Sequence, residues 1–353
     1  MQTVVTAAEL SAAIDDERDL PGCAGLKVAF VPTMGALHEG HLSLVRKARE
    51  WADLVVVSIF VNPLQFGAGE DFEKYPRTLE ADAAVLEAAG ADILFAPTVE
   101  VIYPEVAELG VAAGIEAARA KAKLNPALQS GAIGETFEGA ARPGHFDGML
   151  AVVARLFELV KPDFAVFGAK DAQQLFLIKR MAATAFPDLH IIEAPIVRET
   201  SGLAMSSRNR YLDETALAVA GQLSKALQVG KAAAETLGAK PSLAVNAARA
   251  RLEGVPEAKL DYLALVDPSS FEPIDDSFTG RALMLIAAVA AASNQQVERL
   301  VIRRAGFGTV IATLSGEGET SAAPAPSERT SPASRRSPTD RSPSHRAGRV
   351  PVR

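Results

Sequence analysis

Two histidines near the N-terminus are spaced so that both could act on one ligand. His38 and His41 lie in the stretch PTMGALHEGHLSLV, residues 32–45, where an apolar run gives way through a glycine turn to apolar residues with helical spacing. Positions i and i+3 share one face of a helical turn, so we expect both imidazoles on the same side of a helix start. The spacing leaves three interpretations open: histidines with a structural role, zinc ligands, or hydrogen-bond donors to a phosphate.

The surroundings of the histidine pair bear on these interpretations. Helical zinc pairs usually lie four positions apart, and neither a cysteine nor a third spaced ligand accompanies this pair. A helix start that follows a strand presents main-chain N–H groups and favours an anion. Only the phosphate hypothesis also explains the turn at Gly35, but a structural role stays open at this stage.

Two later loops carry polar groups that could serve the same ligand. FGAKDAQQ, residues 167–174, follows an apolar run and brings the compact positive charge of Lys170. MSSRN, residues 205–209, supplies two hydroxyls and a guanidinium, which are donors that suit pyrophosphate. Gln65 and Gln174 are amides that suit a substrate with hydroxyls and a carboxylate. Taken alone, each of these features is also compatible with solvated loops.

The elements that must position these groups alternate in the manner of an α/β domain. Continuous apolar strands between amphipathic helices indicate a parallel sheet that is covered on both faces. We therefore expect a doubly wound parallel-sheet, Rossmann-like α/β domain over residues 1–198. The predicted strands are the apolar runs at residues 26–33, 53–61, 91–97, 163–168 and 189–197.

The pattern changes after residue 198. An Ala-rich helical stretch over 215–252 precedes two strand-like runs at 260–267 and 281–290, which predicts a smaller α+β C-terminal domain over 199–314. Residues 315–353 are rich in Ser, Pro and Arg and have few large apolar side chains, so we expect a disordered tail. Residues 105–134 are expected to be an insertion or surface flap that contains a helix.

Bulk composition narrows the partners and the compartment. The net charge of −7 argues against nucleic acid or an anionic membrane as the main partner. The single cysteine, Cys23, excludes an intramolecular disulfide, and the first residues lack the pattern of a secretory signal, so we expect a cytoplasmic protein. The longest apolar run, residues 283–292, is far shorter than the roughly 20 residues that span a bilayer. We therefore expect small-molecule substrates.

The motifs together resemble one known family. His38-Glu39-Gly40-His41 is similar to the HxGH signature of the nucleotidylyltransferase superfamily. The longer PTMGALHEGH and the motifs that follow it in order resemble the pantothenate synthetase, or pantoate–β-alanine ligase, family over about residues 27–212. The later motifs are FVNPLQFG (60–67), YPRT (75–78), RPGHFDG (142–148), FGAKDAQQ (167–174) and MSSRNRYL (205–212).

This resemblance implies a reaction, cofactors and an assembly. Pantoate would attack the α-phosphorus of ATP, and β-alanine would then displace AMP from the pantoyl adenylate to give pantothenate. ATP is then a substrate, with Mg²⁺ held by phosphate oxygens, water and one carboxylate at most. Asp82 is a candidate for that carboxylate, but Ala81 stands where the family leads us to expect an acid, so no protein ligand is predicted. Family members are dimers, which implies a homodimer.

The resemblance also assigns roles to individual residues. It implies catalysis by His41, His38 and Lys170, with His41 as the acid toward the developing phosphate charge. It implies substrate contacts at Gln65, Gln174 and Asn62. The implied ATP contacts are Met34, Gly35, Ala36, Leu37, His38, Glu39, Gly40, His41, Gly168, Ala169, Lys170, Asp171, Val197, Met205, Ser206, Ser207 and Arg208.

Some features depart from the family pattern and leave rival hypotheses. Ala169 stands where Glu is expected, Ala172 replaces an aromatic residue, and the segment 105–134 is longer and more helical than usual. Arg142 and His145 are expected to support the site or an interface rather than to catalyse. The rivals are a nucleotidylyltransferase acting on a phosphorylated acceptor and a non-catalytic nucleotide-binding descendant.

Overall fold

A computed structural model describes residues 1–21, 23, 25–67, 70, 72–236, 238–255, 257–290 and 307–314. Side chains are described throughout these ranges except at 288–290 and 307–314. The predicted disordered tail, 315–353, lies outside the described residues. Within the described ranges, none of the helices combines the length and the apolar character that a membrane span requires.

A six-stranded parallel sheet forms the centre of the N-terminal part, with strand order β1-β4-β3-β2-β5-β6. All five predicted strands are present, and a short strand at the N-terminus, which was not predicted, adds the edge. From β2 the chain continues to β3 and β4 on one side of the sheet, and from β5 it continues to β6 on the other side. The strand order therefore reverses between β2 and β5. The strands are β1 (Gln2–Val4), β2 (Val28–Thr33), β3 (Leu54–Ile59), β4 (Ile93–Phe95), β5 (Phe164–Gly168) and β6 (His190–Ala194).

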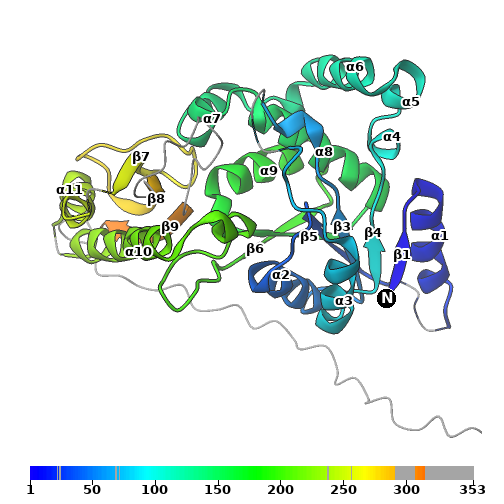
Figure 1. The fold of residues 1–353 in the computed structure, drawn as a ribbon, viewed down its shortest axis with the longest axis horizontal. Coiled ribbons are helices and arrows are strands. Elements are labelled where there is room, and N and C mark those ends of the chain that lie inside the picture. The colour runs from blue at the N-terminus through cyan, green and yellow to red at the C-terminus, as the bar shows by residue number, and fades with distance from the viewer. Residues whose placement is uncertain are drawn as a thin grey trace, which may run out of the picture. The chain divides into compact units, whose positions relative to one another are not determined.

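Helices cover both faces of this sheet (Figure 1). Successive residues of a strand point to opposite faces, so Phe30 and Val56 pack with one set of helices and Val31 and Val57 with the other. The first set is α1 (Ala7–Arg18), α8 (His145–Val160) and α9 (Ala172–Ala185), and the second is α2 (Glu39–Arg49) and α3 (Leu79–Ala89). The predicted doubly wound α/β architecture is confirmed.

The segment between β4 and α8 is more helical than the single predicted helix. Helices α5 and α6 pack against each other so closely that a Cβ on Gly114 would lie 2.3 Å from Cα of Val106. Helix α6 also packs against α8. The elements are α4 (Val99–Ile102), α5 (Glu105–Leu109), α6 (Val111–Lys123), the 3₁₀ turns Pro126–Leu128 and Gly131–Glu135, and α7 (Glu138–Ala141).

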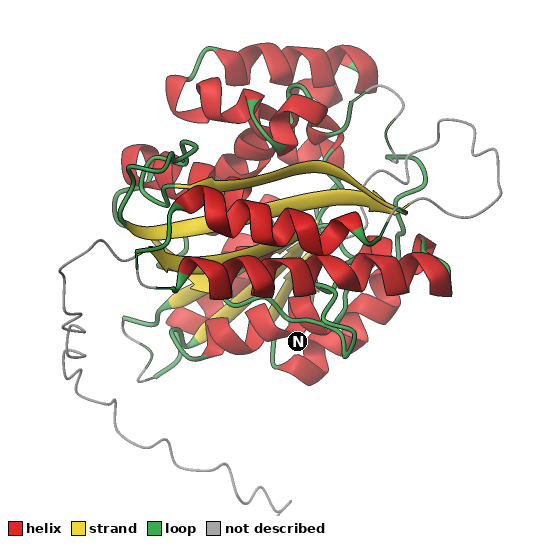
Figure 2. Cartoon of the chain, turned by 90° about the vertical axis from the view of Figure 1, so that its left-hand side faces the viewer, coloured by secondary structure: helices red, strands yellow, loops and turns green. Residues whose placement is uncertain are grey.

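A second, antiparallel sheet lies in the C-terminal part, with the order β7-β8-β9. The long helical stretch that was predicted there divides into two helices, and Pro241 takes the first position of the second, where its missing N–H costs nothing. Both helices pack against the strands, as Figure 2 shows. The elements are α10 (Glu214–Ala234), α11 (Pro241–Glu253), β7 (Ala258–Val266), β8 (Gly280–Ala290) and β9 (Phe307–Leu314).

Candidate active site

A cavity of about 280 Å³ opens beyond the carboxyl ends of β2 and β5, where the strand order reverses. Open α/β sheets bind ligands in this crevice, because helix starts and strand-end loops converge there. The cavity collects side chains from segments that are far apart in sequence. Of the predicted site residues, it is lined by Met34, His38, Gly40, His41, Asn62, Gln65, Gly168, Lys170, Asp171, Gln174, Val197, Met205, Ser206, Ser207 and Arg208.

Five predicted ATP contacts do not line the cavity. They are Gly35, Ala36, Leu37, Glu39 and Ala169. The side chain of Glu39 forms an ion pair with Arg46 farther along α2. The main-chain N–H groups of Ala36 and Leu37 point to the interior of the protein, so neither donates into the cavity.

The group that receives these N–H groups is the carboxylate of Asp82, which is 3% exposed. Its Oδ2 accepts from Ala36 N–H at 2.9 Å and its Oδ1 accepts from Leu37 N–H at 2.8 Å. The hydroxyl of Thr78 donates to Oδ2 as well, at 3.0 Å. Gly35 completes the turn with a φ of +80°, and a Cβ there would lie 3.1 Å from the same carboxylate. Asp82 therefore anchors the turn between β2 and α2.

This geometry is unsuited to the metal role for which Asp82 was a candidate. Its oxygens are occupied by main-chain donors and face away from the cavity lining. Among the residues that the structure describes, no group of three or more His, Cys, Asp or Glu side chains could hold a metal ion.

The two histidines cap the start of α2 in a reciprocal arrangement. Nδ1 of His38 accepts from Gly40 N–H at 3.1 Å, and Nδ1 of His41 accepts from His38 N–H at 3.3 Å. The ring centroids are 4.0 Å apart, so the predicted shared face is present. An Nδ1 that accepts leaves the proton of a neutral imidazole on Nε2. We therefore assign to both rings the tautomer with an Nε2–H donor.

Burial makes the neutral form of both rings dominant near pH 7. Burial, and then the charges of Lys170 and Arg210, lower the pKa of His38 to about 4. Burial, and then the charges of His38 and Lys170, lower the pKa of His41 to about 3. Each ring thus presents a neutral hydrogen-bond donor, and His41 does not carry the additional proton of an imidazolium acid.

The lowered pKa values predict acid sensitivity. Unfolded histidines take up protons near the ordinary pKa of 6.5, and the folded His38 and His41 do so only at lower pH. The free energy of unfolding is therefore expected to be highest above about pH 6.5. It should fall as the pH drops from there toward 4, by at most about 1.4 kcal/mol per pH unit for each buried histidine. Urea denaturation at pH 7.5 and pH 5 measures this slope. His38→Gln should reduce this slope.

Cations reach the cavity from two further loops. Lys170 lies in the 3₁₀ turn Ala169–Asp171 that follows β5, and its Nζ is 3.5 Å from Oδ2 of Asp171. Arg208 lies in the 3₁₀ turn Ser207–Tyr211, and its guanidinium stands over the ring of Tyr75 at 5.7 Å. The hydroxyls of Tyr75 and Ser207 are 3.3 Å apart. Tyr75 thereby ties the segment before α3 to the loop that carries the serines and arginine.

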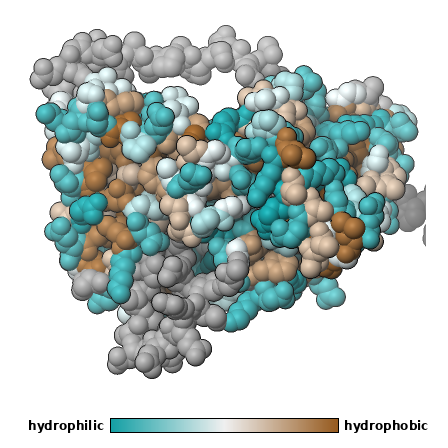
Figure 3. All heavy atoms as spheres, turned by 90° about the horizontal axis from the view of Figure 1, so that it is seen from above, coloured by the Kyte–Doolittle hydropathy of each residue, from teal (hydrophilic) through white to brown (hydrophobic). Residues whose placement is uncertain are grey.

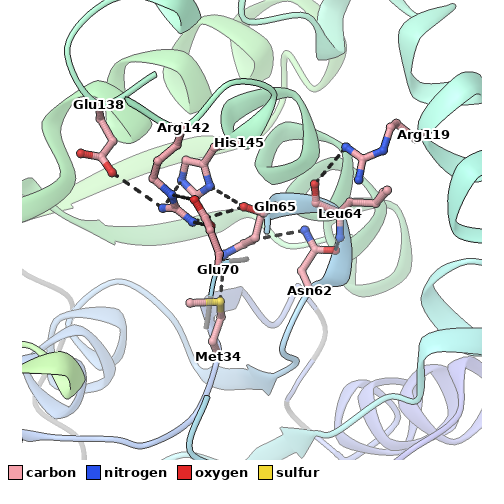
Figure 4. A network of polar contacts seen from close by, with 9 residues as sticks. All are labelled: Met34, Asn62, Leu64, Gln65, Glu70, Arg119, Glu138, Arg142 and His145. Atoms are coloured by element: carbon pink, nitrogen blue, oxygen red, sulfur yellow. Dashed lines mark hydrogen bonds and ion pairs between the residues drawn. The ribbon is translucent and has the colours of Figure 1, made fainter. Parts of the chain in front are cut away.

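Gln65 is held through its main chain by two residues of the RPGHFDG motif (Figure 4). Nδ1–H of His145 donates to the Gln65 carbonyl at 2.8 Å, and Nη2 of Arg142 donates to it at 3.3 Å. Burial, and then the charge of Arg142, lower the pKa of His145 to about 4. Arg142 also binds both carboxylate oxygens of Glu70, at 2.9 and 2.6 Å. These contacts place Arg142 and His145 as supports for Gln65.

Asn62 is a support of the same kind. It is 1% exposed, and its amide is fully hydrogen-bonded within the protein. Nδ2 donates to Oε1 of Gln65 at 3.2 Å and to the Gly148 carbonyl at 3.0 Å. Oδ1 accepts from Leu64 N–H at 3.2 Å and from the hydroxyl of Tyr103 at 2.7 Å. This saturation revises the predicted role of Asn62, because a direct substrate contact would have to displace one of these bonds.

The two adjacent glutamines of FGAKDAQQ have different surroundings. The amide of Gln173 is buried and used: Oε1 accepts from Glu138 N–H at 3.1 Å, and Nε2 donates to the carbonyls of Ile133 and Thr136 at 2.6 and 3.0 Å. The side chain of Gln174 makes no hydrogen bond with any residue of the described ranges. Of the two, Gln174 is therefore the amide that is available to a ligand.

Glu70 and Tyr103 lie outside the cavity lining but support it through Arg142 and Asn62, and the sequence did not indicate them. Glu70 pairs with a residue 72 positions away, and Tyr103 contacts one 41 positions away. Neither belongs to a periodic pattern or a spaced motif that would mark it. A single sequence carries no signal for such long-range pairs.

Comparison with known proteins gives a consistent assignment. The family model described as pantoate-beta-alanine ligase matches residues 2–301. The chain is 46% identical over 288 residues to a pantothenate synthetase from Leifsonia xyli subsp. xyli, which covers 82% of this chain and 92% of that protein. It is 48% identical over 281 residues to a pantothenate synthetase from Acidothermus cellulolyticus, which covers 79% of this chain and 86% of the relative.

Solved structures agree with these relatives. Pantothenate synthetase from Thermus thermophilus is 41% identical with a TM-score of 0.72, over 88% of this chain and 99% of that one. Pantoate-beta-alanine ligase from Francisella tularensis, in complex with beta-gamma ATP and beta-alanine, is 29% identical with a TM-score of 0.60, over 89% and 97%. The family match spans most of the chain, and the cavity holds most of the predicted site residues. The chain belongs to the pantoate–β-alanine ligase family and is a ligase.

Proposed function

We propose that this ligase condenses D-pantoate with β-alanine in an ATP-dependent reaction that passes through pantoyl adenylate. One observation carries the proposal: the Nε2–H donors of the histidine pair, Lys170 and Arg208 line the same cavity as Gln65 and Gln174. Donors to phosphoryl oxygens and amides that suit a hydroxy acid thus face one space. The family and the ATP-bound Francisella relative support ATP as the nucleotide.

The proposed first step joins the pantoate carboxylate to the α-phosphorus and releases pyrophosphate. The protein contributes positioning and stabilisation of charge on phosphoryl oxygens, and needs no covalent chemistry of its own. We propose that His38 and His41 donate through Nε2–H, and that Lys170 and Arg208 neutralise the departing pyrophosphate. We keep the predicted ATP contacts at Gly168, at Val197 and along 205–208.

In the proposed second step, the amine of β-alanine attacks the acyl carbon and AMP leaves. Gln65 and Gln174 would hold pantoate through its hydroxyls and carboxylate. Apolar side chains of α8, among them Met149, Val152 and Val153, line the cavity as well and suit the two methyl groups of pantoate. Because the described residues offer no carboxylate cluster, Mg²⁺ would arrive with ATP, held by phosphate oxygens and water.

Several wider predictions remain part of the proposal. We retain the division into domains at 1–198 and 199–314, a cytoplasmic location and small-molecule partners. We also retain the homodimer. Leu109, Val111 and Leu124 are 56%, 62% and 84% exposed on and beside α5 and α6, so they would offer an apolar contact to a second copy. Figure 3 shows hydrophobic side chains among hydrophilic ones on the face seen from above.

An assay with purified protein, ATP, Mg²⁺, D-pantoate and β-alanine tests the proposed reaction. We expect pantothenate, AMP and pyrophosphate in equal amounts. Without β-alanine, pyrophosphate should stop after roughly one equivalent per site, because the adenylate stays bound. If a phosphorylated acceptor consumed ATP while pantoate released no pyrophosphate, the nucleotidylyltransferase hypothesis would replace this one. If neither acceptor gave turnover, the chain would be a non-catalytic relative.

A further inference from the structure

Tyr103 lies outside the cavity lining but is joined to it through hydrogen bonds. It follows α4, it is 5% exposed, and its ring packs edge-on against Phe60 with centroids 6.3 Å apart. Its hydroxyl donates to Oδ1 of Asn62 at 2.7 Å. Burial raises the pKa of Tyr103 above its ordinary value, so the hydroxyl keeps its proton at physiological pH and remains a donor.

This donor acts on the orientation of the Asn62 amide. Oδ1 of Asn62 faces Tyr103 and Leu64 N–H, which are both donors. Its Nδ2 must then face the opposite way, where the Gly148 carbonyl can only accept. The remaining N–H of Asn62 donates to Oε1 of Gln65 at 3.2 Å. A reversed Asn62 amide would place acceptor against acceptor at Gly148 and donor against donor at Leu64 N–H, and it would lose the short hydrogen bond that Tyr103 donates.

The orientation of Asn62 in turn sets that of Gln65. Since Oε1 of Gln65 is taken by Asn62, its Nε2 faces the cavity side, where it contacts Sδ of Met34 at 2.9 Å (Figure 4). A carboxylate or hydroxyl oxygen of a substrate can accept from Nε2–H, whereas a reversed amide would present an oxygen and repel a carboxylate. Leu64 N–H and the Gly148 carbonyl thus set the polarity of the Asn62 amide, and the Tyr103 hydroxyl, with the shortest contact to it, holds that amide in place against Gln65.

We propose that Tyr103 is a positioning residue that, through Asn62, helps to hold the Gln65 amide with its N–H donors toward the hydroxy-acid substrate. The kinetic part of this inference rests on the proposed function. The structural part, a relay of hydrogen bonds from Tyr103 through Asn62 to Gln65, rests on contacts within the protein. The relay and the proposed function can therefore fail separately.

Tyr103→Phe tests the relay, because it removes one oxygen and keeps the ring that packs against Phe60. We expect kcat/KM for pantoate to fall about three- to tenfold, mainly through KM, as for the loss of one buried hydrogen bond. KM for ATP should stay within about twofold, because the nucleotide contacts do not depend on the relay. In a Gln65→Ala background the same substitution should add nothing further, since the effect passes through that amide.

Ser130→Ala is the matched control. It also removes a buried hydroxyl donor, which contacts Asp147 at 2.6 Å, and among the described residues no hydrogen bond joins Ser130 or Asp147 to Asn62 or Gln65. The control should leave KM for pantoate unchanged. Equal losses with ATP and with pantoate in Tyr103→Phe, or an undiminished loss in the Gln65→Ala background, would reduce Tyr103 to a packing residue and overturn the proposal.

A second measurement does not depend on activity. The side-chain amide resonance of Gln65, identified by its absence in Gln65→Ala, should shift in Tyr103→Phe and exchange faster with solvent, while Ser130→Ala leaves it in place. If the wild type made no pantothenate, the proposed function would fail and this spectrum would still decide on the relay. An unmoved Gln65 resonance in Tyr103→Phe would overturn the inference even in an active ligase.

Discussion

His41→Ala is expected to lower kcat for pantothenate formation by about 10²–10³, the usual cost of removing one preorganised donor to developing charge. The ring presents a neutral Nε2–H donor, because Nδ1 is occupied by His38 N–H and burial lowers the pKa of His41 to about 3. The donor needs no rearrangement when charge builds on the phosphate. Steady-state assays of AMP release at saturating ATP and pantoate measure the effect.

The alanine variant also removes the cap on His38 N–H, so a second variant must separate the two roles. In His41→Asn the side-chain oxygen can take the place of Nδ1 as acceptor, and no group replaces Nε2–H. We expect His41→Asn to fold with nearly wild-type stability and to be as slow as His41→Ala. Recovery of activity in the asparagine variant would show that the cap matters and the donor does not.

Asp82→Asn is expected to lower the free energy of unfolding by about 2–3 kcal/mol, because a buried carboxylate loses its charge and one of its two acceptor oxygens. The new NH₂ group would face the N–H of either Ala36 or Leu37, which leaves a buried donor without a partner. Since these residues form the turn into α2, turnover should fall as well. Urea denaturation with and without Mg²⁺ measures the stability.

The same experiment separates the two roles considered for Asp82. A turn anchor predicts a stability loss that is independent of Mg²⁺ and an unchanged Mg²⁺ requirement. Glu80→Gln removes an exposed charge from the same first turn of α3 and should cost no more than about 0.5 kcal/mol. An Asp82→Asn protein of normal stability that required more Mg²⁺ would restore the metal-ligand hypothesis.

The sequence predicted the sheet, and most of the site residues that its family resemblance implied line the cavity, for identifiable reasons. Strands buried on both faces leave continuous apolar runs such as residues 54–59, and the loops that follow β2 and β5 must meet at the carboxyl edge of the sheet. The edge strand β1 was missed because it spans only three residues at the start of the chain, which is too short for a periodic signal. The division at Pro241 was missed although Gly238 and Pro241 signal a turn and a helix start, because the Ala-rich helical pattern continues on both sides of them.

The motif by itself could not separate residues that face the ligand from those that hold the motif in place. Within the histidine motif, His38 and His41 line the cavity, whereas Ala36 and Leu37 donate inward to Asp82. In FVNPLQFG, Asn62 is saturated by internal hydrogen bonds and orients Gln65. Both distinctions depend on partners that lie dozens of residues away.

The sequence by itself determined the residue types of this protein's chemistry, their order along a doubly wound sheet and the end of the sheet where they gather. These follow from periodicity, from turn-forming glycine and from the direction of parallel strands, which are local properties of the chain. The tertiary structure decided the protonation of the histidines, the role of Asp82 and the orientation of the Gln65 amide. Each of these depends on burial and on which donor faces which acceptor, and both are set only when distant segments pack together.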